Sequence, residues 1–236
     1  EFTGAGVEAC LVALDLETTV AAPPCTNEYV HGMWKRHPQR IIQCWGAVEP
    51  AKGEIAMIQA RKAIKELGFI GFHFHPIMQH FAVSDRRYYP LFEEINAMGA
   101  AVMVDVGTTG MGAGMPGGNG ALVRHAHPEH IDQLAADFPQ LKIIMAHPGW
   151  PWVDETTAVA LHKGNVYWEM SGWAPKHFPG NLKVDIRGRL QDKIMFGSDY
   201  PSLPYERILR EWDELGYKPE VMEKIMHGNA ERVLGL

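Results

Sequence analysis

The feature that most constrains the fold of this chain is the regular alternation of short apolar runs with amphipathic helical segments. Each apolar run is rich in aliphatic and β-branched residues and is ended by Gly, Pro or Asp, as is typical of a buried strand. Such runs predict seven strands, which begin near Ala9, Ile41, Ile70, Ala100, Lys142, Val166 and Lys193. Helices are expected between most of them, and strict alternation of strand and helix favours a parallel sheet with right-handed crossovers.

Seven strands are one fewer than an eight-stranded α/β barrel requires. We therefore expect an α/β fold, either a TIM (β/α)8-type barrel that lacks its first strand or an open doubly wound sheet. Both architectures place ligands at the C-terminal ends of the strands. The 236 residues, 46% of them hydrophobic, suit a single domain over residues 1–236.

Local sequence signals mark the ends of some helices and loops, whereas one segment has no clear pattern. A helix is expected with Asn27 as its N-cap, after a Pro-rich loop at residues 21–25. The glycine-rich stretch at 107–120 lacks the Gly-Lys-Ser/Thr ending of a phosphate-binding loop and is interpreted as a lid or substrate-shaping loop. Residues 181–192 give no clear pattern of either helix or strand.

Composition and charge exclude several classes of partner. The net charge of −6 and the lack of a basic run argue against a nucleic-acid surface, so a small-molecule partner is expected. No apolar run reaches the ~18 residues that a membrane helix needs. The cysteines are odd in number and lack metal-finger or CxxC spacing, which predicts free thiols in a reducing compartment such as the cytoplasm: Cys10, Cys25 and Cys44.

Two strand ends offer groups suited to proton transfer or metal binding. The apolar run at 142–146 delivers His147 just before a Pro/Gly turn, and the run at 193–196 is followed by Asp199 in the sequence Gly-Ser-Asp-Tyr-Pro. Imidazole titrates near neutral pH and suits general acid/base work, or else it is a core histidine that donates to a carbonyl. A carboxylate in the position of Asp199 can ligate a metal or take a proton from a bound water.

Three further residues are candidate metal ligands. His73 and His75 alternate on one strand, so that both side chains point to the same face near its C-terminal end. Asp105 follows four apolar residues, where a charge is costly unless it is paired or metal-bound. For each of them a purely structural role, in packing or in anchoring a loop, stays open. Trp150 and Trp173 follow neighbouring strands and are candidates for an apolar pocket wall or an oligomer contact, with ordinary core packing as the alternative.

Several segments, in order along nearly the whole chain, resemble the amidohydrolase-related (amidohydrolase 2) family. They are Gly71 to Pro76 with Gln79 and Phe81, Val106 to Gly110, Ala146 to Trp152, Met170 to Trp173, Phe196 to Pro201 and Gly228 to Leu236. The resemblance implies a TIM barrel with a divalent metal at its C-terminal mouth, in a family that includes hydrolases and decarboxylases. It implies Asp199 as a metal ligand, His147 as the catalytic histidine and Gln79 beside the substrate.

The chain departs from the family pattern at two places. The paired ligands of the family's first strand have no counterpart, and Asp105 stands where the family has a histidine ligand. A hard oxygen donor favours manganese or magnesium relative to zinc. A complete site would then need either a further N-terminal strand or the recruitment of His73 and His75.

The leading hypothesis is a metal-dependent hydrolase that acts on a small carboxylated or cyclic organic substrate, with zinc or manganese as the ion and magnesium as a further possibility. The first alternative is a non-oxidative decarboxylase of the aminocarboxymuconate-semialdehyde or γ-resorcylate type. The second is an inactive barrel that serves as a binding or assembly partner. The unpaired strand edges of an incomplete barrel also predict a homo-oligomer.

Overall fold

A seven-stranded parallel sheet forms the centre of the protein, in a computed structural model that describes residue 4 and residues 6–236. The strands lie in sequence order, and each pairs in parallel with the next along the chain. Their bounds are β1 Ala9–Val12, β2 Ile41–Ala47, β3 Gly71–Phe74, β4 Ala101–Asp105, β5 Ile143–Ala146, β6 Val166–Glu169 and β7 Ile194–Met195. The seven predicted strands and their parallel arrangement are therefore confirmed.

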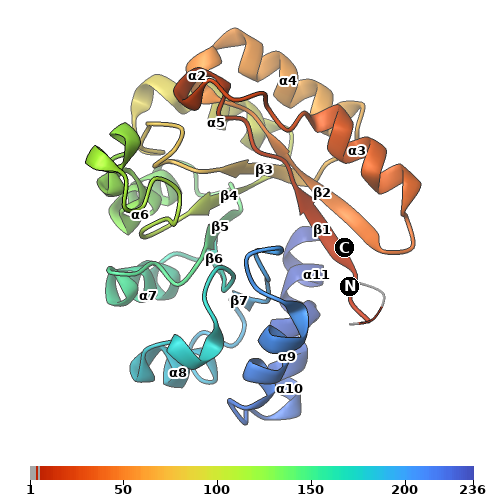
Figure 1. The fold of residues 1–236 in the computed structure, drawn as a ribbon, viewed down its shortest axis with the longest axis vertical. Helices are drawn as coiled ribbons and strands as arrows, with labels where there is room; N and C mark the ends of the chain where they lie inside the picture. Colours follow the sequence, from red (N-terminus) through yellow and green to blue (C-terminus); the bar gives the residue numbers. More distant parts are fainter. Residues whose placement is uncertain (1–3, 5) are drawn as a thin grey trace.

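The helices lie around this curled sheet, most of them on its outer face (Figure 1). Their bounds are α2 Glu17–Val20, α3 Asn27–Arg36, α4 Glu54–Lys65, α5 Tyr89–Ala97, α6 Pro128–Asp137, α7 Val153–His162, α8 Gly180–Ile186, α9 Tyr205–Asp213, α10 Pro219–Glu223 and α11 Asn229–Leu234. A π-helical turn at Lys224–Gly228 joins α10 to α11. The helices α3 and α4 contact β2, α6 contacts β5, and α7 contacts β6. This is the curled α/β arrangement of an incomplete TIM barrel.

Both faces of the sheet are covered by apolar side chains. This explains why nearly every residue in the sequence of the strands is apolar. The outward side chains of β3 to β5 join the helices in the main core: Phe72, Phe74, Val102, Val104, Ile143 and Met145. The inward side chains form a second core with Val233 of α11: Trp45, Ala101, Met103, Ile144, Ala146 and Met195. Helix α11 therefore packs against the concave face of the sheet.

The sheet is not closed within the described residues. β1 pairs only with β2, and β7 pairs only with β6, so these two strands are its edges. The prediction of a barrel without one strand is confirmed in this form. The C-terminal ends of all seven strands still meet at one mouth, and the functional groups gather there.

Two local predictions differ from the structure. Thr26, not Asn27, is the N-cap of α3, because the Thr26 hydroxyl accepts a hydrogen bond from the backbone N–H of Tyr29. The Asn27 side chain instead bonds both backbone groups of Ala47 and ties α3 to β2. Residues 181–192, which had no predicted pattern, contain most of α8, which buries only Leu182 and Ile186.

All three cysteines are free thiols, as predicted. Among the described helices, none combines the length and the apolar character that a membrane crossing requires.

Candidate active site

A pocket opens at the C-terminal ends of β3, β4, β5 and β7. Each of these strands, or the residues directly after it, contributes one ionisable side chain to the pocket. The lining residues are His75, Ile77, Asp105, Gly107, Thr108, Thr109, Gly110, His147, Gly172, Trp173 and Asp199. Four of the five residues predicted as catalytic groups or metal ligands therefore come together in one place.

Asp105 lies at the centre of the charged groups. Its Oδ1 is 2.8 Å from Nε2 of His73 and 3.6 Å from Nε2 of His147, and its Oδ2 is 3.5 Å from Nε2 of His75. His73 of β3 and His75, the first residue after it, both reach this carboxylate, as their alternation in the sequence predicted. His73 itself is bonded behind Asp105 and is not among the lining residues.

The charges in this cluster shift the pKa values of its members in opposite directions. Burial alone would raise the pKa of Asp105, but His73, His75 and His147 together hold it below its usual range. Burial lowers the pKa of His75, and the nearby Asp105 only partly offsets this effect. Burial would also lower the pKa of His147, but the charges of Asp105, Glu169 and Asp199 outweigh burial and raise it.

His147 is held in position from three sides. Its backbone has a φ of 70°, a left-handed conformation that is rare for a residue with a side chain and that recurs at functional sites. The indole N–H of the fully buried Trp168 donates to the His147 carbonyl at 2.6 Å. The ring Nδ1 lies 3.1 Å from the carbonyl oxygen of Ser171. Because a carbonyl only accepts, Nδ1 carries a proton, and Nε2 faces Asp105.

Asp199 follows β7 and is the most accessible acid of the pocket. It also has a left-handed backbone, with a φ of 54°, and its side chain is exposed at the mouth. The two residues predicted to be catalytic, His147 and Asp199, thus share the same uncommon backbone conformation.

Glu169, the last residue of β6, is a site residue that the sequence reasoning missed. Its Oε2 accepts a hydrogen bond from the Ser171 hydroxyl at 2.7 Å, while its Oε1 is shielded from solvent and has no hydrogen-bond partner. Burial raises the pKa of Glu169 to about 7. The signal was present in the sequence, because Glu169 interrupts an apolar strand as Asp105 does.

The residues predicted to contact a substrate lie at different depths. Trp173 lines the pocket. Trp150 is 52% exposed, with its ring centroid 6.2 Å from that of Trp173, and is not among the lining residues. Gln79 is only 3% exposed, and its amide bonds the backbone N–H of His75 and the carbonyls of Asp15 and Val48. The structure therefore gives Gln79 a role in joining three strand-end loops.

The pocket offers atoms of the kind that bind a divalent cation, but these atoms do not converge on a single point where an ion could be held. Among the described residues, no three His, Cys, Asp or Glu side chains are arranged so that they could hold a metal ion. One reason is that the Asp105 carboxylate is turned toward His73, with which it forms a hydrogen bond. Nδ1 of His73 is buried without a hydrogen-bond partner. Carboxylate oxygens with imidazole nitrogens are nevertheless the mixed donor set that manganese, zinc and related ions accept.

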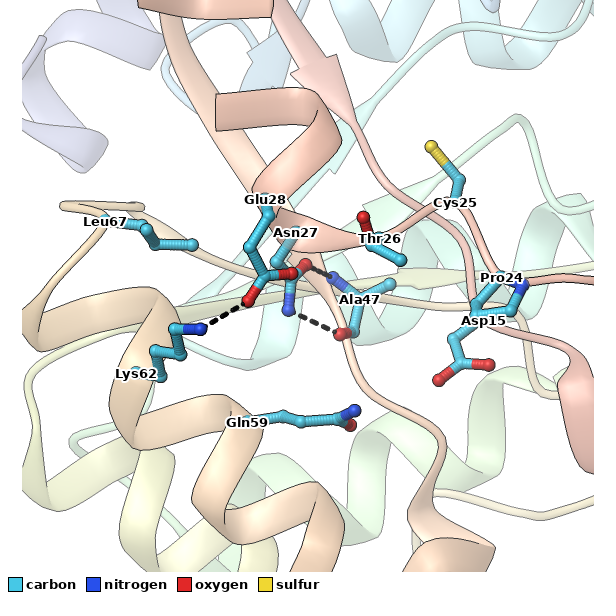
Figure 2. A pocket seen from close by; sticks show the side chains of 10 residues that line it. All are labelled: Asp15, Pro24, Cys25, Thr26, Asn27, Glu28, Ala47, Gln59, Lys62 and Leu67. Carbon is cyan, nitrogen blue, oxygen red and sulfur yellow. Dashed lines mark hydrogen bonds and ion pairs between the residues drawn. The ribbon is translucent and has the colours of Figure 1, made fainter. Parts of the chain in front are cut away.

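A second pocket lies between α3 and α4 and lacks the histidines of the first (Figure 2). An ion pair between Glu28 and Lys62, with a distance of 2.7 Å, spans it, and Asn27 closes its wall against Ala47. The carboxylate of Asp15 at its rim is bonded to Lys52 at 2.6 Å. These contacts hold the two helices against β2, and the pocket offers no acid/base group opposite a histidine.

A curled parallel sheet with helices outside it, and with His and Asp side chains at the strand ends, defines the TIM-barrel class of protein. The chain belongs to the amidohydrolase family, whose model matches residues 7–236.

Solved structures agree with this assignment. An uncharacterised TIM-barrel protein, Bb4693 from Bordetella bronchiseptica, is 30% identical with a TM-score of 0.85, over 99% of this chain and 80% of that one. The 2,6-dihydroxybenzoate decarboxylase from Rhizobium is 15% identical with a TM-score of 0.73, over 99% and 86%. A dihydroxybenzoic acid decarboxylase from Polaromonas with bound manganese and the inhibitor 2-nitroresorcinol is 18% identical with a TM-score of 0.67, over 94% and 76%. The last two likenesses concern the fold alone.

Proposed function

We propose that this protein is a metal-dependent hydrolase that acts on a small cyclic or carboxylated organic molecule. The observation that carries the proposal is the arrangement of His147, whose Nδ1 is anchored at the Ser171 carbonyl and whose Nε2 faces the pocket beside Asp105. An imidazole fixed in one tautomer, with a free nitrogen toward the substrate, is the arrangement that general base catalysis needs.

His147 is the group that moves the proton in this proposal. Its Nε2 takes a proton from an attacking water and later returns it to the leaving group. The nearby carboxylates raise the pKa of His147, so that the imidazolium form is stabilised once the proton has arrived. Ser171 holds the ring through Nδ1 during the transfer, while Trp168 fixes the backbone of His147.

Asp105, Asp199 and His75 are the proposed holders of a divalent ion, with His73 supporting Asp105 from behind through their hydrogen bond. When bound, such an ion lowers the pKa of a coordinated water and polarises a carbonyl group. Manganese is the favoured ion, because two of the three donors are hard carboxylates and because the Polaromonas decarboxylase of similar fold contains it. Zinc and magnesium are the alternatives.

The walls of the pocket offer both polar and apolar surfaces to a small substrate. Trp173 and Ile77 offer apolar surfaces, and Thr108 and Thr109 offer hydroxyl groups. Neither Lys nor Arg is among the described residues that line it. The negative charge of a carboxylated substrate would therefore be balanced by imidazolium groups or by the ion.

A non-oxidative decarboxylase is the second candidate, supported by the similar folds of several decarboxylases. In that reaction His147 would deliver the proton that replaces the departing carboxylate. The two candidates differ in their products, since hydrolysis incorporates an oxygen atom of water and decarboxylation releases carbon dioxide.

The test incubates the manganese-loaded protein in ¹⁸O-labelled water with a panel of lactones, esters and amides, and separately with hydroxybenzoates and muconates. Incorporation of ¹⁸O that is lost in His147→Gln supports the hydrolase. Release of carbon dioxide that is lost in the same variant selects the decarboxylase. A protein inert toward both panels, with a function that survives His147→Gln, would favour the inactive binding barrel.

A further inference from the structure

A carboxylate lies behind His147, outside the pocket. Glu169 is not among the lining residues, and its side chain is partly buried at the end of β6. Its Oε2 accepts the hydrogen bond of the Ser171 hydroxyl, and its Oε1 lies against Gly197, shielded from solvent and without a hydrogen-bond partner. A buried carboxylate oxygen without a hydrogen bond lowers the stability of the fold. We therefore expect Glu169 to contribute to function.

Ser171 connects this carboxylate to His147. The Ser171 hydroxyl oxygen lies 3.1 Å from Nδ1 of His147 and 2.7 Å from Oε2 of Glu169. A serine hydroxyl has only one proton. Because that proton is directed to Glu169, the hydroxyl oxygen can only accept from Nδ1. Without Glu169, the same hydroxyl would be free to donate to Nδ1 and to stabilise the opposite tautomer.

Two glycines leave the space that this arrangement occupies. A Cβ atom at Gly197 would overlap the Glu169 carboxylate. A Cβ atom at Gly172 would lie 2.6 Å from Nδ1 of His147, and Gly172 also has a left-handed φ of 76°. Glycine at position 197 therefore leaves room for the Glu169 carboxylate, and glycine at position 172 leaves room for the His147 ring.

We propose that Glu169 is a positioning residue that orients the Ser171 hydroxyl, so that the proton of His147 stays on Nδ1 and Nε2 stays free toward the pocket. The proposal deepens the proposed function, because it explains how His147 presents the nitrogen that accepts a proton. It concerns the tautomer of the neutral ring, so it can be tested without a substrate.

The test is ¹⁵N NMR of the histidine side chains in the full chain, at a pH where the His147 ring is neutral. We expect Nδ1–H to dominate in the native protein. In Glu169→Met, the Nε2–H form should rise to a comparable population, because the freed Ser171 hydroxyl then competes with the Ser171 carbonyl for Nδ1. Glu169→Gln should keep Nδ1–H, because its amide oxygen still accepts from Ser171.

A double variant separates this role from general structural damage. Ser171→Ala leaves the carbonyl acceptor and removes the competing hydroxyl, so Glu169→Met/Ser171→Ala should return His147 to the Nδ1–H form. His130 provides an internal reference with the opposite tautomer, since its Nε2 donates to the Arg124 carbonyl at 3.1 Å and its Nδ1 faces Ser84. The His130 signals should not move in any variant.

Three results would overturn the proposal. They are an unchanged Nδ1–H population in Glu169→Met, a complete shift to Nε2–H in Glu169→Gln, or no recovery in the double variant. If Glu169→Met does not fold, Glu169→Ala takes its place, because it also removes the acceptor for the Ser171 hydroxyl and should show the same rise in the Nε2–H form. A failure to find hydrolase activity would leave these spectra unchanged, so the two proposals fail separately.

Discussion

Nε2 of His73 lies 2.8 Å from Oδ1 of Asp105, in a contact that is almost fully shielded from solvent. This hydrogen bond turns the carboxylate toward β3 and places it between three imidazoles. Asp105 therefore controls the charge state of the pocket as well as offering a ligand.

Replacing Asp105 by Asn should lower the pKa of His147, because the carboxylate is the largest of the contributions that raise it. An NMR pH titration of the His147 ring measures this change. Asp85→Asn is the matched control, since Asp85 is paired with the exposed Arg87 on another surface. An unchanged His147 pKa in Asp105→Asn would contradict the assigned electrostatics.

Gly197→Ala should destabilise the fold by roughly 1–3 kcal/mol, the usual cost of inserting a methyl group where no space exists. The new Cβ would overlap the carboxylate of Glu169. In a Glu169→Ala background the same change should cost much less, because the obstructing group is gone. Gly164→Ala is the control, since nothing lies within 4 Å of its Cβ position. Urea unfolding measures all four variants, and additive losses would show that the two sites do not touch.

Gln79→Leu should cost about 2–4 kcal/mol of unfolding free energy, since it removes buried hydrogen bonds and leaves their partners unpaired. The lost bonds join Gln79 to His75, Asp15 and Val48, so the loops after β1, β2 and β3 should loosen together. The exposed Gln133→Leu should change stability little. A Gln79→Leu protein that is as stable as the native one would indicate that this amide contributes through a substrate instead.

Glu169 should make the protein less stable as the pH rises from about 4.5 to 7. Its pKa is raised to about 7 by burial from an ordinary value of 4.5. In this window the folded state holds a proton that the unfolded chain releases, so stability falls with increasing pH by up to about 3 kcal/mol. The measurement is the stability difference between the native protein and Glu169→Gln at both ends of the window. A difference that does not change with pH would contradict the raised pKa.

Much of the fold follows from the sequence because the strands are marked by short apolar runs between Gly and Pro signals. Those runs located all seven strands to within about two residues, as the two covered faces of the sheet require. Helix α8 escaped prediction because it buries only Leu182 and Ile186, too few to set a helical period. The N-cap of α3 was misplaced by one residue, because Thr26 and Asn27 are both good capping residues.

The site was predictable where a polar residue ends a strand, and less so elsewhere. His75, Asp105, His147 and Asp199 share one pocket because parallel strands present their C-terminal ends together. The role of Gln79 depends on carbonyls that lie 31 and 64 residues away in the chain, so no local pattern reveals it. Glu169 also ends a strand, but it was missed because its partner is a serine two residues later and its space is provided by Gly197.

Elemental analysis of the purified protein, beside two aspartate variants, shows whether the strand-end cluster holds a divalent metal. We expect near-stoichiometric manganese or zinc in the native protein and in Asp213→Ala, whose residue is exposed at the end of α9. Asp199→Ala should lose that metal. A native protein that takes up no divalent metal even after incubation with manganese or zinc, or an Asp199→Ala variant that retains its metal, would show that Asp199 is not part of a metal site.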